Sequence, residues 1–152
     1  MVAKPFIILL AEDSEHDVRA VERVWQRNNI NNPLRIVRDG QECLDYLLRR
    51  NQYDDPDSCP RPGVLILDIN LPKVDGFKIL KEIKQTPGLK RMPVVVLTSS
   101  SREEDMAQCY DLGANAYITK PLGIEDLSKA LMAFHVFWDM VGLPQDGADD
   151  GN

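Results

Sequence analysis

The chain has 152 residues, a length that suits one domain with a core of its own and is short for two. Hydrophobic residues make up 43% of it and charged residues 28%, and no apolar run reaches the roughly 18 residues of a membrane helix, so we expect no membrane span. The net charge is −6, and the sequence has no basic patch with interleaved aromatic residues, so we expect no nucleic-acid binding.

Apolar runs typical of buried strands alternate with helical periodicities along the chain. Short unbroken apolar runs at residues 6–11, 64–68 and 93–98 are typical of strands covered on both faces of a parallel sheet. Two weaker strands are predicted at residues 34–37 and 116–119. Apolar residues at helical spacing follow each strand, at 18–25, 43–48, 79–83, 106–110 and 124–141. Five such repeats predict a doubly wound α/β sandwich whose ligands bind at the carboxyl ends of the strands.

Two segments lie outside this alternation. Residues 51–63 (NQYDDPDSCPRPG) form a Pro-rich and Asp-rich connection longer than most, which we expect to be a surface loop. After Leu143 the sequence PQDGADDGN has too little apolar surface to fold against anything. We therefore expect one domain over residues 1–143 and a disordered acidic tail over residues 144–152.

The N-terminus and the cysteines indicate a reducing compartment. The first four residues lead directly into an apolar strand without the features of a signal peptide. Cys43, Cys59 and Cys109 form no close metal-ligand pair, and three cysteines cannot all pair in disulfides. We therefore expect a cytoplasmic protein whose cysteines serve as small apolar residues.

Polar residues that a buried strand does not need stand at the ends of four predicted strands. Glu12 and Asp13 follow the first strand, Asp68 closes the third, Thr98 closes the fourth and Lys120 follows the fifth. Because the carboxyl ends of parallel strands share one edge, three carboxylates, a hydroxyl and an ammonium are predicted to converge on one pocket. Their placement at separate strand ends favours a functional site over a set of independent caps.

The predicted pocket suits a metal ion and a phosphoryl group. Three uncompensated carboxylates repel one another, and the usual outcome is a raised pKa or a bound cation. Mg²⁺ fits because it prefers octahedral oxygen coordination, keeps several waters and needs one or two direct carboxylates. Beside such a metal an aspartate can attack phosphorus and form an aspartyl phosphate. Lys120 and Thr98 would then hold the remaining phosphoryl oxygens, and the small side chain of Ser99 would leave room for the group.

Four segments together resemble the signature set of response-regulator receiver domains. They are AEDS (11–14), LDINLPKVDG (67–76), VVVLTSS (94–100) and YITKP (117–121). Thr98 lies thirty residues after Asp68 and Lys120 fifty-two after it, which are the spacings associated with that family. The resemblance extends from residue 5 to about residue 140. It implies a flavodoxin-like (βα)5 sheet with strand order 2-1-3-4-5 and a phosphorelay function, in which a sensor histidine kinase donates the phosphoryl group.

The resemblance also implies a role for each residue of the pocket. Asp68 would be the phosphoacceptor and, with Asp13, a direct ligand of Mg²⁺. The backbone carbonyl of Asn70 would be the third ligand, and Glu12 would act through water. Lys120 would pair with the phosphoryl group. Catalysis would be limited to the protein's own phosphorylation and slow dephosphorylation, so no enzyme acting on a separate substrate is expected.

A switch and a cis peptide bond are further implications of the resemblance. On phosphorylation the Thr98 hydroxyl would move toward the phosphoryl oxygens and Tyr117 would turn inward, altering the surface of the fourth helix, fifth strand and fifth helix. The bond between Lys120 and Pro121 would be cis, a geometry that is essentially confined to proline. From the sequence alone, Tyr117 is equally well a half-buried strand aromatic.

Four alternatives compete with this interpretation. In the structural one, Asp13 or Ser14 simply caps the helix that begins near Glu15. An aspartyl-phosphate phosphatase normally needs a second acid two residues after its nucleophile, where this chain has Asn70. A nucleotide-binding or flavin-binding domain needs a glycine-rich loop, whereas AEDSEHD follows the first strand. A scaffold that has lost phosphotransfer is disfavoured by the complete set of pocket residues.

The last predicted helix has two apolar faces. One is expected to belong to the core and holds Leu127, Ala130, Leu131, Phe134, Trp138 and Val141. Met132, Val136 and Met140 point the opposite way, where a surface helix should be polar. We therefore predict a homodimer through the fourth helix, fifth strand and fifth helix. Ordinary scattered exposure of three apolar side chains is the alternative.

Finer features resemble the single-domain response regulators of cyanobacterial and bacterial phytochromes. These features are the turn PRP at residues 60–62, the run DINLPKVDG and the ending FWDMVGLP. They imply that the phosphodonor is a phosphohistidine on a light-sensing kinase, an inference that rests on family analogy.

Overall fold

The computed structural model describes residues 5–120 and 123–141, and in the last helix it describes side chains up to His135. Within these residues the chain alternates strands with helices as predicted. In chain order the elements are β1 (Ile8–Ala11), α1 (Glu15–Arg27), β2 (Leu34–Val37), α2 (Gly40–Leu47), η1 (Asn51–Tyr53), β3 (Val64–Leu67), α3 (Gly76–Gln85), β4 (Val94–Thr98), α4 (Glu103–Asp111), β5 (Ala116–Thr119) and α5 (Ile124–Val141).

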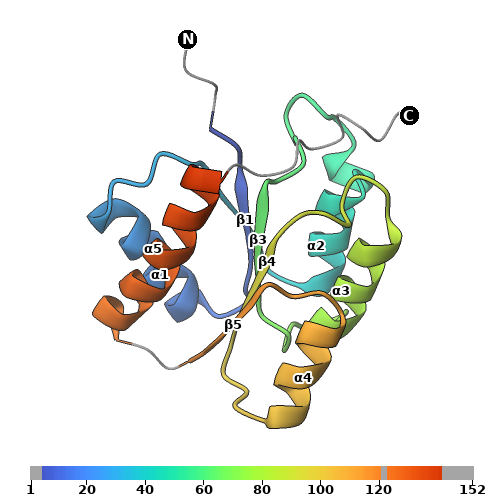
Figure 1. Ribbon diagram of the computed structural model, residues 1–152. Coiled ribbons are helices and arrows are strands. Elements are labelled where there is room, and N and C mark those ends of the chain that lie inside the picture. Colours follow the sequence, from blue (N-terminus) through green and yellow to red (C-terminus); the bar gives the residue numbers. More distant parts are fainter. Residues whose placement is uncertain (1–4, 121–122, 142–152) are drawn as a thin grey trace.

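The five strands form one parallel sheet in the order β2-β1-β3-β4-β5, which confirms the predicted flavodoxin-like arrangement. Figure 1 shows α1 and α5 on one face of the sheet and α2, α3 and α4 on the other. The residues of β1, β3 and β4 are all buried, because each of these strands has a neighbour on both sides and helices on both faces. The edge strands β2 and β5 are partly exposed, which explains their weaker sequence signals.

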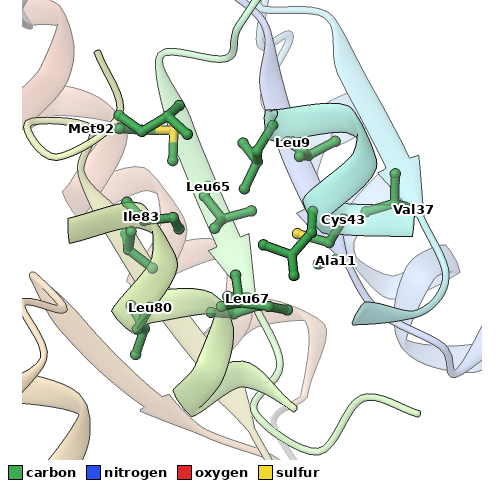
Figure 2. Packing of buried hydrophobic residues seen from close by; sticks show 14 of the residues in the cluster. Leu9, Ala11, Val37, Cys43, Leu65, Leu67, Leu80, Ile83 and Met92 are labelled. Carbon is green, nitrogen blue, oxygen red and sulfur yellow. The ribbon is translucent and has the colours of Figure 1, made fainter. Parts of the chain in front are cut away.

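Two hydrophobic clusters fill the space between the sheet and its two helical layers. The cluster beneath α2, α3 and α4 includes alternate residues of β1 and β3, as expected for side chains that point to opposite faces of a strand. Figure 2 shows Leu65 and Leu67 of β3 interleaved with Cys43 of α2 and with Leu80 and Ile83 of α3. The second cluster packs the opposite side chains of the same strands against α1 and α5.

The helices begin at side-chain caps that the sequence supplies. The Ser14 hydroxyl accepts a hydrogen bond from the backbone N–H of Asp17 at 3.3 Å, so the predicted structural role of Ser14 as a cap is confirmed. Asp39 and Asp75 cap α2 and α3 in the same way. Gly76 follows Asp75 where a Cβ atom would lie 2.5 Å from the Cα of Ile69, so a larger residue would push the loop after β3 away from α3.

The buried face of α4 differs from the predicted one. The apolar pattern at residues 106–110 consists of Met106, Ala107 and Tyr110, but Ala107 and Tyr110 are exposed. The side chain that α4 buries completely is Cys109. Cys109 therefore fills core space as a small apolar residue, as expected of the cysteines, and the buried face of α4 is centred on it and not on Ala107 and Tyr110.

The connection at residues 51–63 is anchored at both ends rather than being a plain surface loop. The Tyr53 hydroxyl donates to a carboxylate oxygen of Glu42 at 2.5 Å, and its ring packs 5.1 Å from the ring of Tyr46. The Tyr46 hydroxyl donates to the carbonyl of Pro60 at 3.0 Å. Cys59 is buried in the core cluster, whereas residues 54–58 are exposed. The exposed part of the connection therefore comprises residues 51, 52 and 54–58, and the rest of it is at least partly buried.

All three cysteines lie in the described part of the chain, where their thiols are free and buried. Burial raises the pKa of Cys109 to about 11 and raises that of Cys43 further. Both are therefore neutral thiols near pH 7, as expected of cysteines that act as small apolar residues. Among residues 5–120 and 123–141, no helix has the length and apolar character needed to cross a bilayer.

Candidate functional site

The strand register brings the predicted pocket residues to one edge of the sheet. Ala11 and Leu67 are partners in the β1–β3 ladder, so Glu12 and Asp68 follow the two strands side by side. The N–H of Asp68 donates to the carbonyl of Ala11 at 3.1 Å. Thr98 is the last residue of β4, and its carbonyl accepts a hydrogen bond of 2.7 Å from the N–H of Lys120, just beyond β5. The convergence expected from the strand ends is thus present.

The Lys120 ammonium lies among three carboxylates. Its Nζ is 2.8 Å from an oxygen of Glu12, 2.8 Å from one of Asp17 and 3.2 Å from one of Asp68. The Lys120 side chain is only 12% exposed, and those of Glu12 and Asp68 are 1% and 7% exposed, whereas Asp17 is 28% exposed. An ammonium has three N–H donors, so these contacts use all of them.

Burial and charge shift the pKa values of this group in a consistent way. Burial raises the pKa of Glu12 to about 7, and the negative charge of Asp68 adds to the increase, while the hydrogen bond from Lys120 opposes it. Burial disfavours the charged form of Lys120, but its hydrogen bonds to Asp17 and Glu12 and the charge of Asp68 outweigh burial and raise its pKa. Lys120 therefore stays positive, and Glu12 titrates near neutral pH.

Three carboxylates of the pocket are arranged as a possible metal site. Oxygens of Glu12, Asp13 and Asp68 lie within 4.8 Å of one another, and Asp13 is exposed while the other two are buried. The donors are all carboxylate oxygens, which suit a hard divalent cation such as Mg²⁺ or Mn²⁺. The exposed Asp13 gives this cluster an open side toward solvent, from which an ion could reach it.

The Asp68 carboxylate is held at both of its oxygens. Oδ1 accepts a hydrogen bond of 2.9 Å from the N–H of Asn70, and Oδ2 accepts the one from Lys120. The side-chain amide of Asn70 also donates to the Thr98 hydroxyl at 3.3 Å. Asn70 therefore connects Asp68 with Thr98, and its carbonyl, the expected third metal ligand, belongs to the same short loop.

On the β5 side of the pocket, hydrogen bonds of hydroxyl and backbone groups replace the ion pairs. Thr98 is completely buried, and its hydroxyl accepts a long hydrogen bond of 3.5 Å from the N–H of Ser100. The Tyr117 hydroxyl donates to the carbonyl of Ser100 at 2.8 Å, and its ring packs partly buried against the core cluster. The Ser100 hydroxyl donates to Asp105 of α4 at 2.6 Å. Ser100 thus joins Thr98, Tyr117 and α4.

The charged residues grouped around Lys120, together with Asn70, line a concave site at the carboxyl edge of the sheet. Its volume is about 410 Å³, and the residues that line it are Glu12, Asp13, Ser14, His16, Asp17, Ala20, Asp68, Asn70, Leu97, Ser99, Lys120 and Leu127. The size and polar lining are sufficient for a phosphoryl group with bound water. Ser99 lies in the lining, as expected of a small residue that leaves room there.

Asp17 is a pocket residue that the sequence analysis did not identify. It lies in the first turn of α1, four residues after Asp13, and its carboxylate contacts Lys120. An acidic residue in the first turn of a helix usually has an ordinary explanation, because it interacts favourably with the helix dipole. Its short distance along the chain from the end of β1 could have identified it. The first turn of a helix that follows a strand after a short loop lies over the end of that strand.

Several predicted residues fall outside the described part of the chain or are only partly described. Pro121, the expected cis proline, and the expected acidic tail at residues 144–152 lie outside the described residues. Met132 is half-buried on α5, while the side chains of Val136 and Met140 are not described. On the opposite face of α5, Leu127 and Leu131 are buried, and Phe134 packs against the core, as predicted.

Comparison with known proteins gives consistent matches over most of the chain. The family described as "Response regulator receiver domain" matches residues 8–132. The chain is 44% identical to response regulator Rcp1 of Synechocystis sp. (strain ATCC 27184 / PCC 6803 / Kazusa) over 141 residues, which cover 92% of this chain and 94% of that protein.

Solved structures of related proteins superpose well on this chain. The Mn(2+)-bound form of Rcp1 has a TM-score of 0.82 at 44% identity, covering 93% of this chain and 100% of that one. The phosphorylated cyanobacterial phytochrome response regulator RcpA has a TM-score of 0.84 at 37% identity, covering 93% and 99%. Response regulator RPA3017, in red light signalling of R. palustris, has a TM-score of 0.85 at 33% identity, covering 93% and 99%.

Proposed function

Because the chain belongs to the response regulator receiver domain family, we propose that Asp68 accepts a phosphoryl group from a sensor histidine kinase. The observation that carries the proposal is the way the Asp68 carboxylate is held, with Oδ1 on the N–H of Asn70 and Oδ2 on Lys120. A carboxylate fixed at the rim of a polar pocket presents an oxygen to phosphorus without a large reorganisation. In this reaction the new bond joins that oxygen to phosphorus, and the bond from phosphorus to the donor's imidazole nitrogen breaks.

The carboxylate cluster of Glu12, Asp13 and Asp68 is proposed to hold Mg²⁺, with the carbonyl of Asn70 as a further ligand. A bound divalent cation offsets the negative charge of the carboxylates and of the phosphoryl oxygens. The Mn(2+)-bound form of the relative Rcp1 supports a divalent cation in a protein of this sequence class. Asp13 and Asp68 are proposed as direct ligands, and Glu12 acts through water.

Lys120 and Thr98 are proposed to receive the oxygens of the phosphoryl group. Lys120 supplies a positive charge from a site where burial strengthens its interactions. The Thr98 hydroxyl is free to donate, since it acts as the acceptor in both of its hydrogen bonds described above. Movement of Thr98 would be felt by Tyr117 through Ser100, which makes these two residues the proposed switch.

The signal is proposed to leave through the surface formed by α4, β5 and α5. Met132, Val136 and Met140 on α5 would form a homodimer interface there. Light scattering of wild type against the double variant Met132→Glu with Val136→Glu tests this: a wild-type monomer, or an unaffected dimer, contradicts it.

The proposed kinase is of the phytochrome type, in line with the related response regulators RcpA and RPA3017. The proposed location is the cytoplasm.

A phosphatase that turns over a separate substrate is the second candidate function. Such enzymes use an acid two residues after the nucleophilic aspartate, and Asn70 occupies that position here. A carboxamide does not take up a proton near neutral pH, so Asn70 cannot act as the general base, and its amide donates to Thr98 instead. We propose that catalysis is limited to the protein's own phosphorylation and slow dephosphorylation, in a domain spanning residues 1–143.

Intact-mass measurement after incubation with phosphoramidate and Mg²⁺ tests the phosphoacceptor. Wild type is expected to gain the mass of one phosphoryl group, and Asp68→Asn is expected to gain none. Asp54→Asn removes an exposed carboxylate of the 51–63 connection and should behave like wild type. Equal phosphorylation of Asp68→Asn and wild type would contradict the proposal.

A second experiment tests the donor. It compares phosphoryl transfer from a purified phytochrome kinase with transfer from a histidine kinase that senses no light.

A further inference from the structure

Asp17 occupies a position in the pocket that the proposed phosphoryl transfer does not use. Its Oδ2 is 2.8 Å from the Lys120 ammonium, as close as the Glu12 carboxylate. Its oxygens are not part of the cluster that Glu12, Asp13 and Asp68 form. A role for Asp17 must therefore be sought in its contact with Lys120.

We propose that Asp17 is a positioning residue that holds the Lys120 ammonium before phosphorylation and competes for it with the incoming phosphoryl group, an inference that rests on the proposed function of Asp68. The argument begins with the number of donors. Lys120 has three N–H groups, and three carboxylates already accept from them at 3.2 Å or less. A phosphoryl oxygen can be bound by Lys120 only if one carboxylate gives up its hydrogen bond.

Asp17 is the carboxylate that can leave at the lowest cost. Glu12 is almost fully buried and also accepts a hydrogen bond of 3.2 Å from the N–H of Ser14, so losing Lys120 would leave its charge poorly solvated. Asp68 carries the incoming group and stays next to Lys120. The Asp17 side chain is 28% exposed, so water can replace the ammonium at its oxygens. Lys120 is therefore expected to exchange Asp17 for the phosphoryl group.

The position of Asp17 is fixed by the start of α1 and not by Lys120. The backbone N–H of Asp17 donates to the hydroxyl of Ser14, the cap of the helix. This holds the Asp17 backbone over the pocket edge whether or not the lysine is bound. Asp17 can therefore take the ammonium back when the phosphoryl group is lost, which gives the unphosphorylated state a defined position for Lys120.

Binding of beryllofluoride, which resembles a phosphoryl group on a carboxylate, measures this competition. Titration calorimetry is carried out on the full chain at saturating Mg²⁺. Asp17→Asn keeps the size of the side chain but removes its charge, so Lys120 is held less strongly and beryllofluoride is expected to bind about fivefold more tightly. Asp17→Glu restores a carboxylate and is expected to bring the affinity back toward that of wild type.

Glu15→Gln is the matched control, because it removes the same charge from the same turn of α1. Glu15 is exposed and pairs with Arg19 and Arg38 at the surface, away from Lys120. The affinity of the Glu15→Gln variant for beryllofluoride is expected to stay within twofold of that of wild type. Thermal unfolding of each variant shows whether the pocket is intact, and a purely structural role of Asp17 would lower stability without tightening beryllofluoride binding.

The outcomes separate this inference from the proposed function. If wild type binds beryllofluoride but Asp17→Asn binds it equally or more weakly, competition by Asp17 is wrong while Asp68 remains the phosphoacceptor. If Glu15→Gln tightens binding as much as Asp17→Asn, the effect is one of net charge and the inference fails. If wild type neither binds beryllofluoride nor accepts a phosphoryl group, the proposed function fails and this inference fails with it.

Discussion

Asp68 lies between two regions that are built from different interactions. On the α1 side, Lys120 joins three carboxylates by contacts of 3.2 Å or less, and most of this group is buried. Opposite charges at this depth interact strongly, and each is costly without its partners. This region is therefore sensitive to any change of charge, including the arrival of a cation or of a phosphoryl group.

The α4 side of Asp68 holds its residues by hydrogen bonds instead, most of them between neutral groups and one from the Ser100 hydroxyl to the Asp105 carboxylate. Thr98, Ser100 and Tyr117 are connected through one hydroxyl–amide contact and one hydroxyl–carbonyl contact. Hydrogen bonds of this kind contribute about 1 kcal/mol each and can be exchanged for others at little cost. We propose a division of work, in which the α1 side receives the phosphoryl group and the α4 side changes shape in response.

Removing the positive charge of Lys120 should give the largest loss of stability. A small loss would contradict the contrast drawn between the two sides of Asp68. Lys120→Met leaves the buried Glu12 and Asp68 without a positive partner. In metal-free buffer at pH 8 we expect the free energy of unfolding to fall by about 3 kcal/mol, measured by urea unfolding. Added Mg²⁺ should restore part of this loss, because it supplies the missing positive charge.

The control for this variant is a lysine whose ion pair is at the surface. Lys73→Met removes a contact of 3.4 Å to Asp39 in which the lysine is 67% exposed. We expect a loss below about 1 kcal/mol. Equal losses for Lys73→Met and Lys120→Met would show that burial gives the pocket no special sensitivity.

The pH dependence of metal binding should show the next largest effect. Because burial raises the pKa of Glu12 to about 7, this carboxyl is largely protonated at pH 6 and largely ionised at pH 8. Mg²⁺ favours the ionised form, so its affinity is expected to rise about tenfold between these two pH values, measured by calorimetry. Glu12→Gln cannot titrate and should flatten this dependence. A slope that survives in Glu12→Gln would assign the titration to another group.

The raised pKa of Glu12 also makes the stability of the metal-free protein depend on pH. A carboxyl whose pKa is higher in the folded state binds its proton more tightly there than in the unfolded chain. Its contribution to stability is therefore complete below the ordinary pKa of 4.5 and is lost as the pH rises to about 7. Metal-free wild type is expected to lose more stability than Glu12→Gln across this interval.

Removing the Tyr117 hydroxyl on the α4 side of Asp68 should give the smallest effect. It tests whether the two sides act separately. Tyr117→Phe removes the hydrogen bond of 2.8 Å to the Ser100 carbonyl but keeps the ring in the core cluster. We expect a loss of about 1 kcal/mol in the free energy of unfolding and an unchanged Mg²⁺ affinity. Tyr110→Phe, at the exposed aromatic of α4, should change neither quantity. A weaker Mg²⁺ affinity in Tyr117→Phe would mean that the two regions are not separate.

The sequence predicted the sheet and five pocket residues because both depend on local patterns. Glu12, Asp13, Asp68, Thr98 and Lys120 each stand at the end of an apolar run, and a parallel sheet gathers such positions at one edge. The order of the strands came from the family resemblance, and the structure confirms it. The edge strands gave weaker signals because part of their surface faces solvent.

What the sequence did not show depends on contacts between distant residues. Asp17 reads as an ordinary first-turn acid until Lys120, 103 residues later, is placed beside it. Likewise, Tyr46 and Tyr53 anchor the 51–63 connection through hydrogen bonds to Pro60 and Glu42, and neither bond has a signature in a local pattern. The buried face of α4 also differs from the apolar pattern at residues 106–110, because the packing of α4 on the sheet buries Cys109 and leaves Ala107 and Tyr110 exposed.

The buried thiols have a practical consequence for following the protein in solution. A maleimide reacts with an exposed thiolate, and Cys43 and Cys109 are neither exposed nor ionised near pH 7. Cys59 is also covered by the core. A single cysteine introduced by Tyr110→Cys on the outer face of α4 can therefore carry a fluorophore while the native cysteines stay in place. Such a label would report the movement of α4 in real time as a kinase is added.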